Sequence, residues 1–117
     1  MREKIKDQGR LEHILEMIQN LQEAKRHHTY EDIQNDRILF YGLTKMVEII
    51  GEAAYKLTHE FTDSHPELPW KEIIGMRHIL VHGYFQVSPK VIWDVIQNDI
   101  TAMGPYIEKY IDEYKSE

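Results

Sequence analysis

The sequence contains no cysteine, and its six glycines form no glycine-rich phosphate loop. The lack of cysteine excludes disulfides, thiolate catalysis and thiolate metal sites. We also find no Walker pattern and no nucleophilic serine elbow. No apolar run approaches the roughly 20 residues that a membrane-spanning helix needs, and the N-terminus is charged where a signal peptide would be apolar. We therefore expect a cytoplasmic protein with no membrane partner.

The chain also lacks an excess of positive charge. It has 14 lysines and arginines against 20 aspartates and glutamates, a net charge of −6. A protein that coats nucleic acid non-specifically must neutralise many phosphates, so this class is disfavoured and DNA is not an expected partner. An enzyme that grips a short RNA in one locally basic cleft is still compatible with this charge. An acidic surface also suits docking onto a basic protein partner.

What the sequence does contain is helical periodicity, with almost no strand signal. Its 117 residues are 42% hydrophobic and 29% charged, which suits one globular domain over residues 1–117 with a real core. Apolar residues recur at spacings of three and four in four long segments. The fold class we predict is all-α: an antiparallel helical bundle of four long helices plus short extra helices.

Local signals set the expected helix boundaries. The first helix should cover residues 4–26, followed by a short turn over 30–33 capped by Thr29. A second helix, capped by Asn35 or Asp36, carries a coiled-coil-like apolar seam. The seam consists of Leu39, Leu43, Met46, Ile50, Ala53 and Leu57.

The second half of the chain begins with an expected loop over residues 58–69. A third long helix should then run over 69–81, with Gly83 in the left-handed conformation common after a helix. The last helix should start at Ser88, with proline in its first turn, and could kink at Pro105. Its expected buried residues are Ile92, Val95, Ile96, Ile100, Met103, Ile107 and Tyr110.

The third helix ends in the most informative segment, residues 77–84. Arg77, His82 and Tyr84 place a permanent cation, an imidazole and a phenol in an otherwise apolar stretch. Charge stabilisation, proton transfer and an attachment point are what metal-free handling of a phosphodiester requires. Each residue alone would more often be a structural feature, but the three together favour a functional site.

Helical geometry sets a condition on that site. Arg77 and His82 point about 140° apart on an ideal helix. Either the helix unwinds before Gly83 and swings His82 round, or the site is built from two chains. The apolar arc of this helix covers about 220°, wider than contact with one core requires. We therefore predict a homodimer with this helix at or beside the two-fold axis.

Two further residues are candidates for a supporting role. His78 and His82, four residues apart, share a helical face at a spacing that can chelate zinc or nickel. A third ligand would have to come from the 58–69 loop, so we expect no metal and no cofactor. Glu52 follows Gly51, where a small residue allows close helix approach. It is either a salt-bridged or solvent-facing carboxylate, or a group that orients Arg77.

The Arg-x4-His-x-Tyr pattern of residues 77–84 resembles the signature of the HEPN superfamily of small helical domains. More narrowly, the chain resembles the HepT toxins, which are encoded beside a minimal nucleotidyltransferase (MNT) antitoxin. The segments Gly51–Ala54, Pro69–Arg77 and Val91–Ile96 resemble family segments in the same order. The resemblance covers roughly residues 36–110. The motif alone is weakly specific, but the ordered set is strongly so.

The resemblance implies roles for individual residues. Arg77 and His82 would carry metal-independent RNA cleavage, with Arg77 stabilising phosphate charge and His82 moving protons. Tyr84 would be the residue to which the antitoxin attaches AMP, placing bulk and negative charge beside Arg77. His78 departs from the family pattern, which often has asparagine or aspartate there, so it could alter activity or share the work of His82.

The resemblance implies the toxin half of a type VII toxin–antitoxin pair, with RNA and the cognate nucleotidyltransferase antitoxin as partners. One alternative is a non-catalytic, nucleotide- or partner-binding helical subunit of a nucleotidyltransferase. Another is a purely structural dimer, in which Arg77 would be fully paired with an acid such as Glu52. The endoribonuclease requires an open, basic cleft around Arg77. This requirement distinguishes it from both alternatives.

Overall fold

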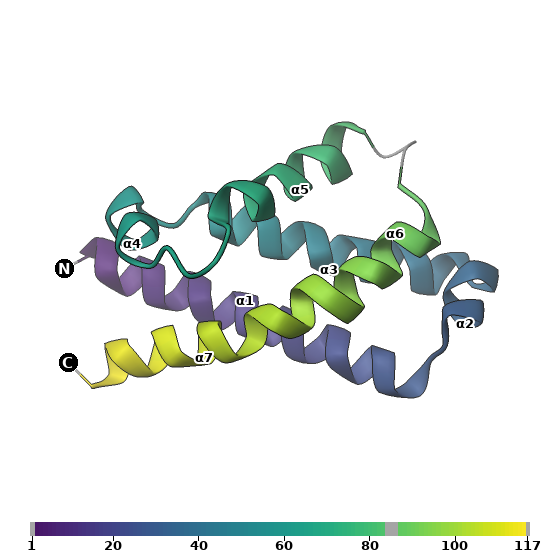
Figure 1. The fold of residues 1–117 in the computed structure, drawn as a ribbon, viewed down its shortest axis with the longest axis horizontal. Helices are drawn as coiled ribbons and strands as arrows, with labels where there is room; N and C mark the ends of the chain where they lie inside the picture. The colour runs from purple at the N-terminus through teal and green to yellow at the C-terminus, as the bar shows by residue number, and fades with distance from the viewer. Residues whose placement is uncertain (1, 84–86, 117) are drawn as a thin grey trace.

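The computed structural model describes residues 2–83 and 87–116, and every regular element in these ranges is a helix. No helix in these ranges is both long and apolar enough to cross a membrane. Successive long helices run in alternating directions, so both ends of the chain lie at the same end of the molecule (Figure 1). The elements are α1 (Arg2–His27), α2 (Tyr30–Asn35), α3 (Arg37–Tyr55), α4 (His59–Ser64), α5 (Trp70–His82), α6 (Pro89–Asp94), the π-helical segment η2 (Val95–Ile100) and α7 (Thr101–Lys115).

The core forms where the predicted apolar faces meet. α3 packs against α1 on one side and against α5 on the other, and α1 also packs against α7. In the seam predicted for the second helix, Leu39 and Met46 are partly exposed, while the other four residues are buried. All seven residues predicted for the buried face of the last helix are buried. The 3–4 spacing therefore identified the correct faces.

Helix starts follow the predicted cap chemistry. The Thr29 hydroxyl accepts a hydrogen bond from the Asp32 backbone N–H (3.2 Å), and the Asp32 carboxylate accepts one from the Thr29 N–H (2.8 Å). Asp36 caps α3, and Ser88 caps α6 with a proline next to it. Each cap satisfies backbone N–H groups that a helix start would otherwise leave without partners.

The predicted loop over residues 58–69 contains a short helix, α4, that the periodicity did not indicate. Thr58 caps it, and the buried carboxylate of Asp7 in α1 holds this cap in place. Asp7 accepts hydrogen bonds from the Thr58 backbone N–H (3.0 Å) and from its hydroxyl (2.7 Å). A six-residue helix with one buried residue, Phe61, is too short to show a repeating apolar pattern.

The last helix departs from regular geometry before its proline. Pro105 lies inside α7, whereas the π-helical hydrogen-bonding pattern is found in η2, upstream of it. The Thr101 hydroxyl donates to the carbonyl of Ile96 (3.1 Å), a contact to the backbone within this region. The irregularity is therefore located at η2, a feature that the sequence analysis did not predict.

Gly83 does not adopt the predicted left-handed conformation. Its φ is −115° and its ψ is 32°, and no residue within 2–83 and 87–116 has a positive φ. Its N–H donates to the carbonyl of Ile79 (2.7 Å), which closes the last turn of α5. Because this bond forms at an ordinary φ, the helix end does not require a left-handed residue.

Candidate functional site

The candidate site is centred where α5 crosses α3 at Arg77. Gly51 of α3 lies directly against this residue: a Cβ atom built on Gly51 would be 2.6 Å from the Cβ of Arg77. Real Cβ atoms do not approach this closely, so any side chain at Gly51 would push the helices apart. The small residue predicted to allow close helix approach therefore does so at the arginine of the motif.

Two residues of α3 hold the guanidinium of Arg77. Its Nε donates to the Glu52 carboxylate in an ion pair, and its central carbon lies 5.1 Å from the centre of the Tyr55 ring. The Nζ atom of Lys56 also lies 3.6 Å from Oε1 of Glu52. The Arg77 side chain remains 26% exposed.

Glu52 forms a salt bridge, and its partner is Arg77. This contact fits both the structural interpretation of Glu52 and its interpretation as a group that orients Arg77. The hydrogen bond from Arg77, followed by the charges of Arg77 and Lys56, lowers the pKa of Glu52 although partial burial opposes this shift. The carboxylate therefore stays ionised at neutral pH and keeps its hold on the Nε side of the guanidinium.

The structure does not bring His82 to Arg77 within one chain. α5 is helical through His82, so the two side chains diverge by about 140°. The expected alternative in which the helix unwinds before Gly83 is wrong, because the closing hydrogen bond to Ile79 is formed. Tyr84, the predicted modification site, lies outside the described residues.

His78 and His82 lie together on the exposed side of α5, with their ring centres 4.7 Å apart. The loop does not supply a third ligand to them. His65 stacks on Phe61, and its Nε2 lies 2.9 Å from the Glu113 carboxylate on α7. In the described part of the chain, no group of three or more histidines, aspartates or glutamates is placed to hold a metal ion.

Comparison of the sequence with known proteins identifies the family of this chain. A sequence model described as "Ribonuclease HepT-like" matches residues 14–111, from α1 through most of α7. The chain belongs to the HepT-like ribonuclease family. The resemblance inferred from the ordered motifs is thereby confirmed.

Individual HepT-like relatives match over most of their length. A provisionally named RNase from Caldanaerobacter subterraneus subsp. tengcongensis is 41% identical over 88% of both chains. A probable ribonuclease HepT from Thermococcus cleftensis is 36% identical over 85% of this chain and 90% of its own. A provisionally named RNase from Methanocaldococcus jannaschii is 31% identical over 81% and 87%, respectively. No solved structure matches this chain significantly.

The HepT-like motif did not point to Tyr55, which the sequence analysis missed. This side chain is 59% exposed and follows Glu52 by three residues, so both occupy one face of α3. The available signal was an aromatic residue on the same helix face as the predicted acidic partner. We refer to Gly51, Glu52, Tyr55 and Arg77 as the Arg77 corner.

Proposed function

We propose that this protein is a metal-independent endoribonuclease in which Arg77 and His82 cleave RNA. His82 accepts the proton of a ribose 2′-hydroxyl as that oxygen attacks the adjacent phosphorus. The bond to the 5′-oxygen breaks, and the imidazolium returns the proton to this leaving oxygen. Arg77 stabilises the negative charge that builds on the phosphate. The products are a 2′,3′-cyclic phosphate and a 5′-hydroxyl.

The observation that carries this proposal is the state of Arg77 in a HepT-like chain. Glu52 and Tyr55 fix one edge and one face of the guanidinium, while its side chain remains partly exposed. A preoriented cation loses little freedom when it binds a phosphate, which is what electrostatic stabilisation of a transition state requires. The family names of the relatives supply the reaction class.

The divergence of Arg77 and His82 supports an active site built from two chains. α5 also exposes apolar side chains to solvent: Ile79 is 48% exposed and Val81 is 38% exposed. Burying these side chains against a second copy would remove them from water. We propose a homodimer of antiparallel four-helix bundles in which His82 of one subunit works with Arg77 of the other.

Mixed dimers test this arrangement directly. Arg77→Ala and His82→Ala should each lower RNA cleavage at least about 100-fold without changing helicity or the elution volume of the dimer. Co-expressed with different tags and purified as a heterodimer, the two variants together rebuild one intact composite site and should recover activity. An inactive heterodimer would place both residues of a site in one chain, and a fully active single variant would remove that residue from catalysis.

We also propose that the ribonuclease is the toxin of a type VII pair and that its MNT-type nucleotidyltransferase adenylylates Tyr84. Tyr84 follows His82, the last residue of α5, by two positions in the sequence, and AMP attached to it would add bulk and negative charge to the segment after the proposed catalytic histidine. Intact mass after co-expression with the nucleotidyltransferase should show an AMP adduct that Tyr84→Phe abolishes. An adduct that persists in this variant would lie on another residue.

The Arg77–Glu52 ion pair also favours a second candidate, a purely structural helical dimer. In that case the pair serves only to join α3 and α5. RNA cleavage separates the two candidates, because the structural dimer would cut no RNA at any protein concentration, with or without a partner protein.

A further inference from the structure

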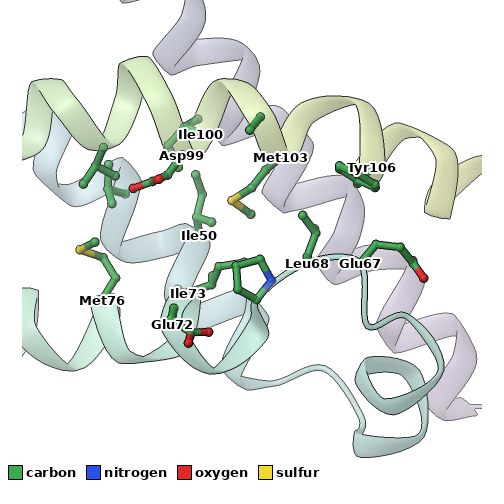
Figure 2. A pocket seen from close by; sticks show the side chains of 15 residues that line it. Ile50, Glu67, Leu68, Glu72, Ile73, Met76, Asp99, Ile100, Met103 and Tyr106 are labelled. Carbon is green, nitrogen blue, oxygen red and sulfur yellow. The ribbon is translucent and has the colours of Figure 1, made fainter.

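A groove lies between α5 and the helices α3, η2 and α7, and Gly51 is the one member of the Arg77 corner that lines it. Its volume is about 540 Å³, and Arg77 is not among the residues that line it. Ile50, Ile73, Met76 and Met103 provide an apolar floor. Figure 2 shows these side chains in the space between the helices. The groove is in the size range of a binding site and does not belong to the proposed phosphate site.

The charged residues of the groove all have the same sign. Glu67, Glu72 and Asp99 line it, and the lining includes no lysine, arginine or histidine. Asp99 and Glu67 lie toward opposite ends of the row of lining side chains (Figure 2). Neither Glu72 nor Asp99 forms an ion pair within residues 2–83 and 87–116. A phosphodiester would be repelled from this surface, whereas a cation would be attracted to it.

A hydrogen bond from Tyr110 holds Glu67 at one end of the groove. The Tyr110 hydroxyl donates a hydrogen bond to its carboxylate (2.7 Å). Burial, followed by the contact with Glu67, raises the pKa of Tyr110, so the phenol remains a donor at any physiological pH. This end of the groove therefore presents a carboxylate that is already oriented by a hydrogen bond.

The length of the groove indicates the kind of occupant. Its lining on η2 and α7 extends from residue 95 to residue 106, which is about 16 Å, or three helical turns. An apolar floor of this length between two helices matches the helix-in-groove mode of recognition, in which one face of an amphipathic helix supplies the anchoring side chains.

We propose that this groove binds an amphipathic helix of a partner protein that carries lysines or arginines beside its apolar stripe. The apolar side chains occupy the floor, and the basic ones pair with Glu67, Glu72 and Asp99. Charge selects this occupant over a second copy of the chain, whose net charge is −6. The inference is independent of the proposed ribonuclease activity, because the side chains of Arg77, Glu52 and Tyr55 do not line the groove.

A designed helical peptide of leucine and lysine serves as the probe, with a leucine and glutamate peptide of equal length as the control. The chain provides internal reporters, because Met76 and Met103 line the groove while Met17 and Met46 do not. With ¹³C-methyl methionine, the lysine peptide should shift the Met76 and Met103 methyl signals and leave the Met17 and Met46 signals in place. Shifts at all four methyls, or equal binding of the glutamate peptide, would overturn the proposal.

Charge reversal tests the rim separately from the net charge. Glu72→Lys with Asp99→Lys should weaken binding of the lysine peptide at least about tenfold. The control, Glu12→Lys with Glu16→Lys, makes the same change of net charge on the exposed side of α1 and should leave most of the binding intact. Equal weakening by both pairs would mean that the peptide responds to overall charge and not to the groove.

Blocking the groove distinguishes a partner helix from a second copy. Ala102 is exposed and lines the groove, so Ala102→Trp can fill it without entering the core. Binding of the lysine peptide should be lost, while sedimentation reports an unchanged oligomeric state. Conversion of an oligomer to a monomer by Ala102→Trp would show that a second copy covers the groove, and the proposal would then be wrong.

Discussion

The two sides of α5 meet their neighbours in opposite ways. Toward α3, Gly51 lets the backbones approach until a single added carbon would collide with Arg77. Toward α7, the helices stand far enough apart to leave a groove of about 540 Å³. The close side carries the partly exposed cation, and the open side carries three carboxylates. The two proposals thus assign ligands of opposite charge to the two sides of α5.

Breaking the close side should have the largest effect on stability. Gly51→Ala forces a Cβ against Arg77, and overpacking of this kind costs about 1–3 kcal/mol, which outweighs the gain in helix propensity. Gly75 of α5 is the control, since nothing lies within 4 Å of a Cβ built there. Gly75→Ala should leave the free energy of unfolding unchanged or raise it by up to about 1 kcal/mol. Urea denaturation measures both, and equal effects would contradict the close approach.

Removing the aromatic face of the Arg77 corner should have a smaller effect. Tyr55→Leu deletes the ring beside the guanidinium, a contact worth about 0.5–1 kcal/mol at an exposed site, so RNA cleavage should fall about two- to fivefold. Tyr55→Phe keeps the ring and should behave like the wild type. Tyr41→Leu removes another exposed tyrosine of α3 as a control. A loss equal to that of Tyr55→Leu in the control would show that the effect is not specific to Arg77.

The smallest effect concerns the pH dependence that Glu52 gives to stability. Its pKa is lowered in the folded protein, so its contribution is present above the ordinary carboxyl pKa and is lost as the pH falls through the lowered value. At neutral pH the free energy of unfolding of the wild type should exceed that of Glu52→Gln by at most about 1 kcal/mol, because the Glu52 side chain is partly exposed. Thermal melts at neutral and acidic pH should show this gap narrowing in acid. A gap independent of pH would mean that the charge of Glu52 does not stabilise the fold.

Local chemistry explains which parts of the fold could be predicted. Thr29, Asp36 and Ser88 act on backbone groups within three residues, so their caps were readable from the sequence. The helix α4 was missed because Phe61 is its single buried residue and its cap is held by Asp7, far away in the chain. η2 was missed because a π-helical segment preserves the apolar composition on which the helix prediction rests.

The candidate site was predictable where the motif and the small residue pointed to the same contact. Gly51, Glu52 and Arg77 were singled out, and the structure brings them together. Tyr55 and the groove depend on how far apart neighbouring helices stand, which periodicity within one helix does not encode. Ideal helix geometry predicted that Arg77 and His82 diverge, and α5 is helical through both residues. The dimer, the partners and the single domain over residues 1–117 stay predictions.

The hydrogen bonds between Asp7 and Thr58 bear on how this protein can be shortened. They fasten the beginning of α1 to the segment that leads into α5. A chain trimmed past Asp7 would free the α4 region while leaving most of the α1 core intact. Truncation at the amino terminus should therefore be felt first as increased protease sensitivity around residues 58–69, before any loss of overall helicity.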